Sequence, residues 1–432
     1  MDRGTATQAP GAALRETAVE VLDGNWSRDH TLPSRALYPH QWSWDSAFIS
    51  IGLAHYAPDR AWLELRTLFQ AQWEDGRVPH IVFDPGVAER DYFPGPAFWD
   101  VPGRHTTGVV QPPVHAVAAW EVYRRTGDRE QLSWLYPRLV EQQRYLARRR
   151  DVARDGLACI VHPWESGLDN SPSWDGALSA VPVDPGVLRR HRRRDIDRAQ
   201  AAHRPTDDDY ARFIAIAEAY RARHYQDQDL AADHPFLVEC PAFNAISAAA
   251  EGALARIAEV LGADPGPHRE QAARITRALV DRLYDPDSGM FHARDVRSGK
   301  LSPARCVNGL IPLMLPDLPA GQVDTLLAAA RSPRFGLDPA MVLPLPSYDR
   351  TAPDFDHLRY WRGPVWVNVN WLVWRGLREH GQEALAGSLR ACLLRLIARS
   401  GCYEYFDPAT GSGIGATAFS WTAALALDLL AN

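Results

Sequence analysis

Apolar residues recur every three to four positions along most of the chain, and this spacing constrains the fold more than any other feature. Alternating patterns typical of β-strands are few and short. Pro58 stands at the expected start of one helix and Gly262 at the expected end of another, with Gly376 or Gly381 ending a third. The periodicity predicts about twelve amphipathic helices, near residues 10–23, 43–56, 58–73, 112–126, 129–150, 241–262, 267–284, 304–314, 320–331, 364–380, 383–399 and 416–430.

This helix count predicts an all-α fold. About twelve helices joined in antiparallel pairs can close into two concentric rings, the (α/α)6 barrel. No linker rich in Pro, Gly and Ser divides the chain, so we expect a single domain over residues 1–432. Residues 165–240 do not fit the pairing, because they are polar and rich in arginine and carry one helix near 206–227. Since long insertions in compact domains often carry function, we expect this one to form a cap over one mouth of the ring.

The charge and the cysteines argue against several classes of protein. A net charge of -6 offers no electrostatic footprint for nucleic acid or an anionic membrane. The exception is a run of arginines between residues 189 and 194, which acidic residues follow and which we interpret as a solvated loop or helix face. The five cysteines are scattered, without the pairing of a zinc site or a disulfide framework. We therefore expect neither a metal nor a cofactor.

The amino terminus lacks an apolar stretch long enough for a signal peptide. No other segment approaches the roughly 18 apolar residues of a membrane span. The sequence therefore predicts a cytoplasmic protein with no membrane or nucleic-acid partner, and it leaves open whether the chain forms a homo-oligomer.

Tryptophan and tyrosine are abundant, with 15 and 14 residues, and many of them do not follow the core spacing. Such residues recur in four polar clusters. The clusters lie at 38–45 (YPHQWSWD), 162–172 (HPWESGLDNSP), 360–366 (YWRGPVW) and 403–408 (YEYFDP). A pyranose ring has apolar faces that stack on aromatic rings and a rim of hydroxyls that need polar partners. One such tryptophan alone more often packs a core, but four repeats of the combination favour a small sugar-containing substrate.

Two carboxylates in these clusters are suited to glycoside hydrolysis, which needs one protonated and one ionised carboxyl group. Asp169 lies in a turn punctuated by Gly and Pro, where partial desolvation would raise its pKa and keep the acid form. Glu404 lies between two tyrosines. Taken alone, Asp169 could be an Asx-turn residue and Glu404 an ordinary surface group. Only the fold can bring them together, because 235 residues separate them.

The clusters resemble those of glycoside hydrolase family 63, especially its compact bacterial mannosylglycerate and glucosylglycerate hydrolases. The resemblance implies an (α/α)6 barrel, in agreement with the helix count, and an inverting mechanism. It places the general acid at Asp169 and the general base at Glu404. The matching blocks span nearly the whole chain in the family's order: YPHQWSWDSAFISIG at 38–52, QPPVHA at 111–116, HPWESGLDNSPSWD at 162–175, RPTDDDYAR at 204–212, YWRGPVWVNVNW at 360–371 and YEYFDPATGSGIGATAFSWTAAL at 403–425.

The resemblance also implies which residues bind the sugar. A carboxylate at Asp45 is equally favoured at a helix N-terminus by the helix dipole, and both roles are compatible. The implied sugar-binding residues are Tyr38, Trp42, Asp45, Gln111, Trp164, Trp361, Arg362 and Trp366.

The substrate is indicated by Arg204 and Tyr210, which lie in a block that resembles the glycerate-binding part of the subgroup. Tyr92 and Tyr360 would add hydroxyl donors. An arginine can bind a carboxylate bidentately, which a neutral oligosaccharide would not require; the simpler reading is a surface arginine. We predict hydrolysis of 2-O-glucosylglycerate or 2-O-mannosylglycerate to hexose and glycerate. The alternatives are an α-glucosidase for a neutral di- or oligosaccharide, and a sugar-binding protein without catalysis.

Overall fold

The computed structural model describes residues 10–184, 186–191, 193, 194, 196 and 200–432. Its backbone is mostly helical, as predicted, and the strands are two-residue pairings. The long helices are α1 (Pro10–Asn25), α2 (Ser43–Leu53), α3 (Pro58–Gln70), α5 (His115–Thr126), α6 (Arg129–Tyr145), α10 (Asp207–Ala222), α12 (Pro241–Leu261), α13 (Gly266–Leu283), α14 (Ala320–Arg331), α15 (Val367–Glu379), α16 (Glu383–Ser400) and α17 (Ser420–Ala431).

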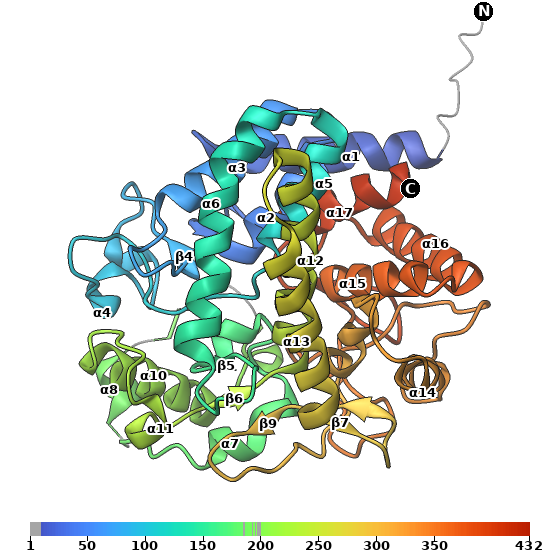
Figure 1. The fold of residues 1–432 in the computed structure, drawn as a ribbon. Helices are drawn as coiled ribbons and strands as arrows, with labels where there is room; N and C mark the ends of the chain where they lie inside the picture. The colour runs from blue at the N-terminus through green and yellow to red at the C-terminus, as the bar shows by residue number, and fades with distance from the viewer. Residues whose placement is uncertain (1–9, 185, 192, 195, 197–199) are drawn as a thin grey trace, which may run out of the picture.

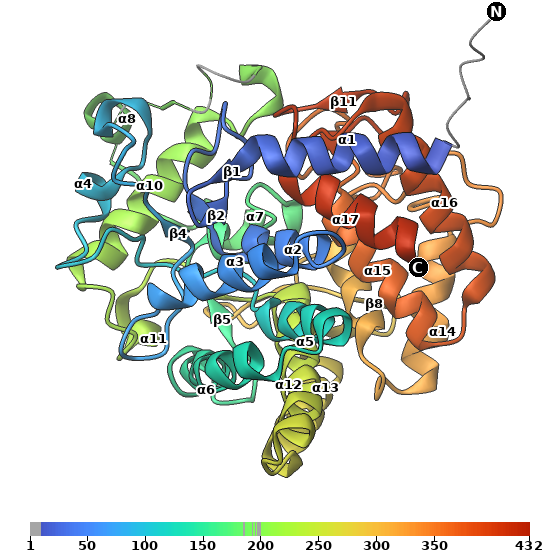
Figure 2. The ribbon, with the colours of Figure 1, turned by 90° about the horizontal axis from the view of Figure 1, so that it is seen from above.

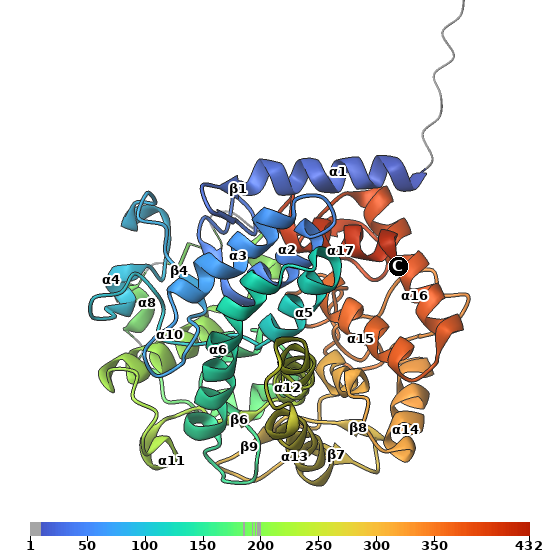
Figure 3. The ribbon, with the colours of Figure 1, turned by 45° about the horizontal axis from the view of Figure 1, so that its top comes forward.

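Helices far apart in the sequence contact one another in a closed order. Contacts run from α2 to α5, from α5 to α12, from α12 to the 3-10 helix η6 (Val307–Met314), and from η6 through α15 and α17 back to α2. Each of these inner segments also packs on a further helix: α17 on α1, α2 on α3, α5 on α6, α12 on α13, η6 on α14 and α15 on α16. Figure 3 shows these partner helices on the outside, and Figure 2 shows α1 lying along α17.

Two segments that were predicted as α-helices contain other types of helix. The segment expected near 304–314 is the 3-10 helix η6, which contains Pro312. Proline lacks the N–H that an α-helix interior needs, and its ring clashes with the preceding turn. The helix expected over 129–150 ends as an α-helix at Tyr145 and continues as a π-turn over Leu146–Arg150, which places the Arg150 side chain in the interior.

The chain leaves this arrangement between β5 (Cys159–Ile160) and β6 (Val238–Glu239). These two strands pair with each other, and β6 also pairs with β9 (Arg294–Asp295). The segment between them carries α10 and the short helices α7 (Asp175–Ser179), α8 (Val187–Arg190) and α11 (Leu230–Asp233). A second excursion follows β4 (Ile81–Val82) and contains α4 (Pro96–Trp99). The two excursions lie side by side (Figure 1), and Phe93 stacks on His191 with ring centroids 5.5 Å apart.

The remaining strands form antiparallel hairpins or pairs. They are β1 (Trp26–Ser27) with β2 (His30–Thr31), β3 (Gln41–Trp42) with β4, β7 (Tyr284–Asp285) with β8 (Met290–Phe291), and β10 (Tyr405–Phe406) with β11 (Gly413–Ile414).

A single apolar cluster runs from Leu14 in α1 to Leu429 in α17. Several predicted site residues stand where the inner helices begin: Trp42 directly precedes α2, and Trp366 directly precedes α15. The N-terminal ends of the inner helices therefore position the site. No helix among the residues that the structure describes is long and apolar enough to span a bilayer.

Candidate active site

A cavity opens where the two excursions meet the N-terminal ends of the inner helices. Eight predicted site residues line it: Tyr38, Trp42, Tyr92, Trp164, Asp169, Arg204, Tyr210 and Tyr360. They come from segments spread over more than 300 residues of sequence, from 38 to 360. The cavity combines aromatic surface with one arginine and one carboxylate of the predicted set, the composition expected for a sugar carrying an anionic group.

Asp169 lies in an irregular loop between two 3-10 turns, Pro163–Ser166 and Pro172–Trp174. The Trp174 indole N–H donates to the Asp169 carbonyl at 3.0 Å, which fixes the loop from behind. Burial raises the pKa of the Asp169 carboxyl to about 7, although the nearby Arg204 guanidinium lowers it. A large fraction of this side chain is therefore protonated at neutral pH, as a general acid requires.

Glu404 is 1% exposed and lies next to the β10–β11 hairpin. Its Oε2 accepts the Ala416 backbone N–H at 3.0 Å, and its Oε1 accepts the Tyr38 hydroxyl at 2.7 Å. Burial raises the pKa of Glu404 above its ordinary value, an effect that Arg204 and these two hydrogen bonds oppose without cancelling it. Glu404 is thus held by donors that favour the carboxylate, next to two residues that line the cavity.

Arg204 is 8% exposed, which excludes the simpler reading of a surface arginine. Its guanidinium lies over the Tyr360 ring, 4.2 Å from the centroid. One of its nitrogens, Nη1, is 4.0 Å from Glu404 Oε1. Arg204 therefore lines the cavity close to the predicted base, and its charge lowers the pKa of both Glu404 and Asp169.

Asp45 lies in the first turn of α2 and is 3% exposed. Burial raises the pKa of Asp45, and the charges of Glu404 and Asp169 raise it further. The side-chain oxygen of Gln111 accepts the backbone N–H of Trp44 at 3.1 Å, so it fixes this same turn. Three carboxyl groups, from Asp45, Asp169 and Glu404, thus interact at one end of the ring.

Trp361 and Trp366 form a stack behind the cavity. Their rings are parallel within 3°, with centroids 3.8 Å apart, and Tyr405 stacks on Trp366 at 4.7 Å. Both tryptophans are 1% exposed or less. The stack supports Tyr360, whose ring centroid is 5.0 Å from that of Trp366, and Tyr405, the neighbour of Glu404.

Arg362 is not brought to the cavity. It forms a two-pronged ion pair with Asp175, at 2.9 and 2.5 Å, and lines a separate surface depression with Asp209 and Arg359. Its predicted contact with the sugar stays a prediction, and its observed partner is the segment that follows the Asp169 loop.

The interpretation of the arginine run as a solvated face was wrong for two of its members. Arg193 is 6% exposed and lies 4.4 Å from the centroid of the Tyr210 ring, and Arg194 lines the cavity. Arg189 and Arg190 are exposed, as expected, and Arg192 lies outside the described residues. Sequence composition reports a charge run but not which of its members the fold turns inward.

His80 lines the cavity and was missed by the sequence analysis. It stacks near Trp164 at 6.3 Å and meets the edge of Trp42 at 4.6 Å. Burial lowers the pKa of His80 to about 3, so the imidazole is neutral. The sequence signal was a histidine among apolar residues, which is equally typical of a core position. In the described part of the chain, no three His, Cys, Asp or Glu side chains group as metal ligands would.

These features define a class of protein: buried, interacting carboxyl groups below an aromatic cavity in an α-helical ring are typical of a glycoside hydrolase. A family model described as mannosylglycerate hydrolase MGH1-like glycoside hydrolase domain matches residues 38–422. The chain belongs to this glycoside hydrolase family, within family 63, and it is an enzyme.

Curated relatives match over nearly the full chain. A mannosylglycerate hydrolase of Rubrobacter radiotolerans is 41% identical over 423 residues, 95% of each protein. A glucosylglycerate hydrolase of Mycolicibacterium hassiacum is 36% identical and covers 96% of this chain and 97% of its own length. The crystal structure of the mannosylglycerate hydrolase from Thermus thermophilus in complex with Tris and D-glycerate superposes with a TM-score of 0.89, at 42% identity, covering 96% and 99% of the two chains.

Gly415 approaches Glu404 so closely that a larger residue would displace the carboxylate. Its φ is +76°, and a Cβ there would lie 2.4 Å from Glu404 Oε2. We expect Gly415→Ala to lower kcat about 10- to 100-fold, because ångström-scale misplacement of a reacting group has effects of this order. Gly381→Ala is the control, since Gly381 also has a positive φ but an open surrounding. Steady-state kinetics of both variants would contradict the prediction if they lost activity equally.

Proposed function

We propose that this glycoside hydrolase is an inverting enzyme that cleaves 2-O-glucosylglycerate or 2-O-mannosylglycerate to hexose and glycerate, with Asp169 as general acid and Glu404 as general base. The observation that carries the proposal is the placement of Asp169 and the buried Arg204 in one aromatic cavity. The relatives named mannosylglycerate and glucosylglycerate hydrolase support the same substrate class.

The assignment of acid and base follows from the surroundings of the two carboxyl groups. Asp169, with a pKa of about 7, can supply a proton to the glycosidic oxygen at neutral pH. Glu404 accepts hydrogen bonds from Tyr38 and Ala416 and lies near Arg204, all of which favour its ionised form. An ionised Glu404 would activate a water for attack from the opposite face. Inversion requires the two carboxyl groups to stand roughly 6.5–9.5 Å apart across the substrate.

The two parts of the substrate, hexose and glycerate, would bind to different residues of the site. Trp42 and Trp164 offer apolar rings for the faces of the hexose, and Asp45 and Gln111 would fix its hydroxyls, supported by the stacked Trp361 and Trp366. On the side of the cap, Arg204 would bind the glycerate carboxylate. Tyr92, Tyr210 and Tyr360 would add hydroxyl donors there.

The architecture that we propose is a single-domain (α/α)6 barrel over residues 1–432. The inner ring would be α2, α5, α12, η6, α15 and α17, which contact one another in closed order. Residues 165–240 would form the cap, to which the excursion with α4 adds Tyr92. All five cysteines are buried, free thiols. In line with the scattered cysteine pattern, we propose that the enzyme acts in the cytoplasm, and the acid–base pair needs no metal or cofactor.

Proton NMR tests the reaction. The purified enzyme is mixed separately with glucosylglycerate, mannosylglycerate and an α-glucobiose. We expect free glycerate and β-hexose to appear before mutarotation, which establishes substrate and inversion together. Turnover of the glucobiose alone would leave the acid–base pair standing but would overturn the role of Arg204. An initial α-hexose product would overturn inversion.

Arg204→Met is expected to raise the KM for the glycerate-bearing substrate by roughly 10- to 150-fold, since a hydrogen-bonded charge is worth about 1.5–3 kcal/mol. A 4-nitrophenyl glycoside of the same hexose, which lacks the carboxylate, should show little change in KM. Removing the guanidinium also removes a charge that lowers the pKa of Glu404, so the acid limb of the rate profile should move to higher pH for both substrates.

The matched control is Arg212→Met on α10, the helix that follows Arg204 in the chain, where Arg212 pairs with Asp208. An equal rise in KM for both substrates in the Arg204 variant would contradict a carboxylate-binding role.

A further inference from the structure

The loop that carries Asp169 contains a second carboxylate, Glu165, which is fully buried. Arg150 donates to it twice, from Nη1 to Oε2 at 2.7 Å and from Nη2 to Oε1 at 2.8 Å. The backbone N–H of Val110 donates to Oε1 at 3.0 Å, and that of Val161 to Oε2 at 2.7 Å. Each oxygen thus has two donors, which leaves Glu165 engaged by the protein rather than by substrate.

These four hydrogen bonds join three separate pieces of the site. Val161 follows β5, and Glu165 stands four residues before Asp169 in the sequence. Val110 directly precedes Gln111, whose side chain fixes the first turn of α2. One carboxylate therefore ties the acid loop to the loop that enters α5 and to the end of β5.

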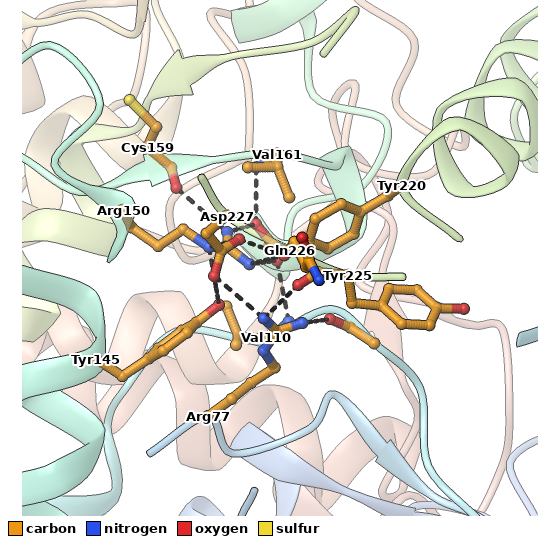
Figure 4. Close-up of polar contacts among 12 residues, drawn as sticks. Arg77, Val110, Tyr145, Arg150, Cys159, Val161, Tyr220, Tyr225, Gln226 and Asp227 are labelled. Carbon is orange, nitrogen blue, oxygen red and sulfur yellow. Dashed lines mark hydrogen bonds and ion pairs between the residues drawn. The ribbon is translucent and has the colours of Figure 1, made fainter. Parts of the chain in front are cut away.

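Arg150 continues the chain of charges to Asp227, whose side chain is 2% exposed. Figure 4 shows Asp227 between Arg150 and Arg77, and each arginine approaches it to 3.1 Å. The hydroxyls of Tyr145 and Tyr220 also donate to Asp227. Burial alone would raise the pKa of Asp227, but the two guanidinium groups hold it below its usual value. Two carboxylates and two arginines thus alternate in the interior.

The far end of this network anchors the cap. Asp227 follows α10, the helix whose first turns carry Tyr210. Arg77 donates to the carbonyl of Tyr225 at 2.7 Å and to that of Gly108 at 2.6 Å. The Tyr225 ring lies so close to Gly108 that a Cβ there would be 2.1 Å from it. The end of the cap is thereby seated on the same loop that Glu165 holds.

We propose that Glu165 is a positioning residue, which, through Arg150 and Asp227, holds the loop of the acid Asp169 in register with the cap segment that carries Arg204 and Tyr210. This inference rests on the proposed function, since it assigns the acid to Asp169. A buried chain of charges adds little stability compared with apolar residues of the same size, so geometry rather than stability is its expected contribution. One network would then fix the relative positions of the cap residues that bind the leaving group and of Asp169, which protonates it.

The test compares two substrates that differ in their need for an acid. A glycosyl fluoride of the same hexose releases fluoride with little help from a proton donor, whereas the glycerate substrate requires one. We expect Glu165→Gln to lower kcat for the glycerate substrate about 10- to 100-fold and for the fluoride at most about threefold. Tyr220→Phe removes one hydroxyl that contacts both Asp227 and Arg150. It should also lower kcat more for the glycerate substrate than for the fluoride, but by a smaller factor than Glu165→Gln.

Glu121→Gln is the matched control. Glu121 is also buried among arginines, with Arg375 at 2.8 Å and Arg125 at 3.1 Å, but it lines a different cavity, to which α5, α12, α13, α15 and α17 contribute. Glu121→Gln should lower the melting temperature, but it should change kcat by the same factor for both substrates.

The outcomes separate the two claims. If the wild type hydrolyses both substrates and the Glu165 and Tyr220 variants slow both equally, the positioning role is overturned and the proposed function stands. If Glu165→Gln does not fold, the Tyr220→Phe comparison decides the question. If the wild-type enzyme hydrolyses neither substrate, the proposed function is wrong and the positioning role falls with it.

Discussion

Asp169→Asn should lower kcat for the glycerate-bearing substrate by roughly 10²–10⁴-fold, the range that general acid catalysis contributes. Asparagine keeps the size of the side chain but has no proton to give to the glycosidic oxygen. The kcat for a glycosyl fluoride should fall far less, because fluoride ion leaves without needing a proton. Steady-state rates with both substrates check this. Asp184→Asn, the same change at an exposed position in the segment between β5 and β6, serves as the control.

The pH dependence of kcat is a second test of Asp169 as the general acid. With a pKa of about 7, the Asp169 carboxyl loses its proton as the pH rises through neutrality. The wild-type kcat for the glycerate substrate should therefore fall on the alkaline side, whereas fluoride hydrolysis should not show that limb. Near-normal turnover of the glycerate substrate by Asp169→Asn, or an alkaline limb of equal size with the fluoride, would mean that another group is the acid.

The helices could be predicted from the sequence because their pattern and their punctuation are local. Gly262 ends α12 in a left-handed conformation, as expected. Gly376 was one of two candidate helix ends, yet it lies inside α15, where a Cβ would be 2.7 Å from the backbone of Leu313. A glycine that permits close packing and a glycine that ends a helix look alike in one sequence. Only the contact distinguishes them.

The site was predictable to the extent that its residues sit in recognisable blocks. Three members of the predicted set, Asp169, Arg204 and Tyr210, line one cavity, and their roles there stay predictions. The hydrogen bond between Tyr38 and Glu404 joins residues 366 positions apart, so periodicity carries no information about it. His80 and Arg194 were missed for the same reason, since their surroundings are made by segments distant in the chain. Arg362 stands in a matching block, yet its side chain pairs with Asp175.

The buried network of charged residues was the feature that the sequence indicated least. Glu165 stands in one of the matching blocks, but nothing there indicates its partners, and nothing local distinguishes Asp227, Arg77 or Arg150 from other charged residues of the chain. Their common property is burial, and a buried charge requires partners that only the tertiary structure supplies. The buried contacts therefore say more about how the Asp169 loop is held in place than the motif around Asp169 does.

Glu404→Gln should lower kcat by roughly 10²–10⁴-fold for the glycerate substrate and for the glycosyl fluoride alike, because both reactions need an activated water. Glutamine keeps the size of the side chain and can still accept the Tyr38 hydrogen bond, but its amide NH2 then faces the Ala416 N–H, so the change removes the base together with one hydrogen bond. Added azide needs no base to attack, and it should restore turnover of the fluoride as a glycosyl azide of inverted configuration. Glu64→Gln, an equally buried glutamate on α3, should not respond to azide. A Glu404 variant that hydrolysed the fluoride at the wild-type rate and lost only the glycerate substrate would show the opposite assignment, with Glu404 as the proton donor.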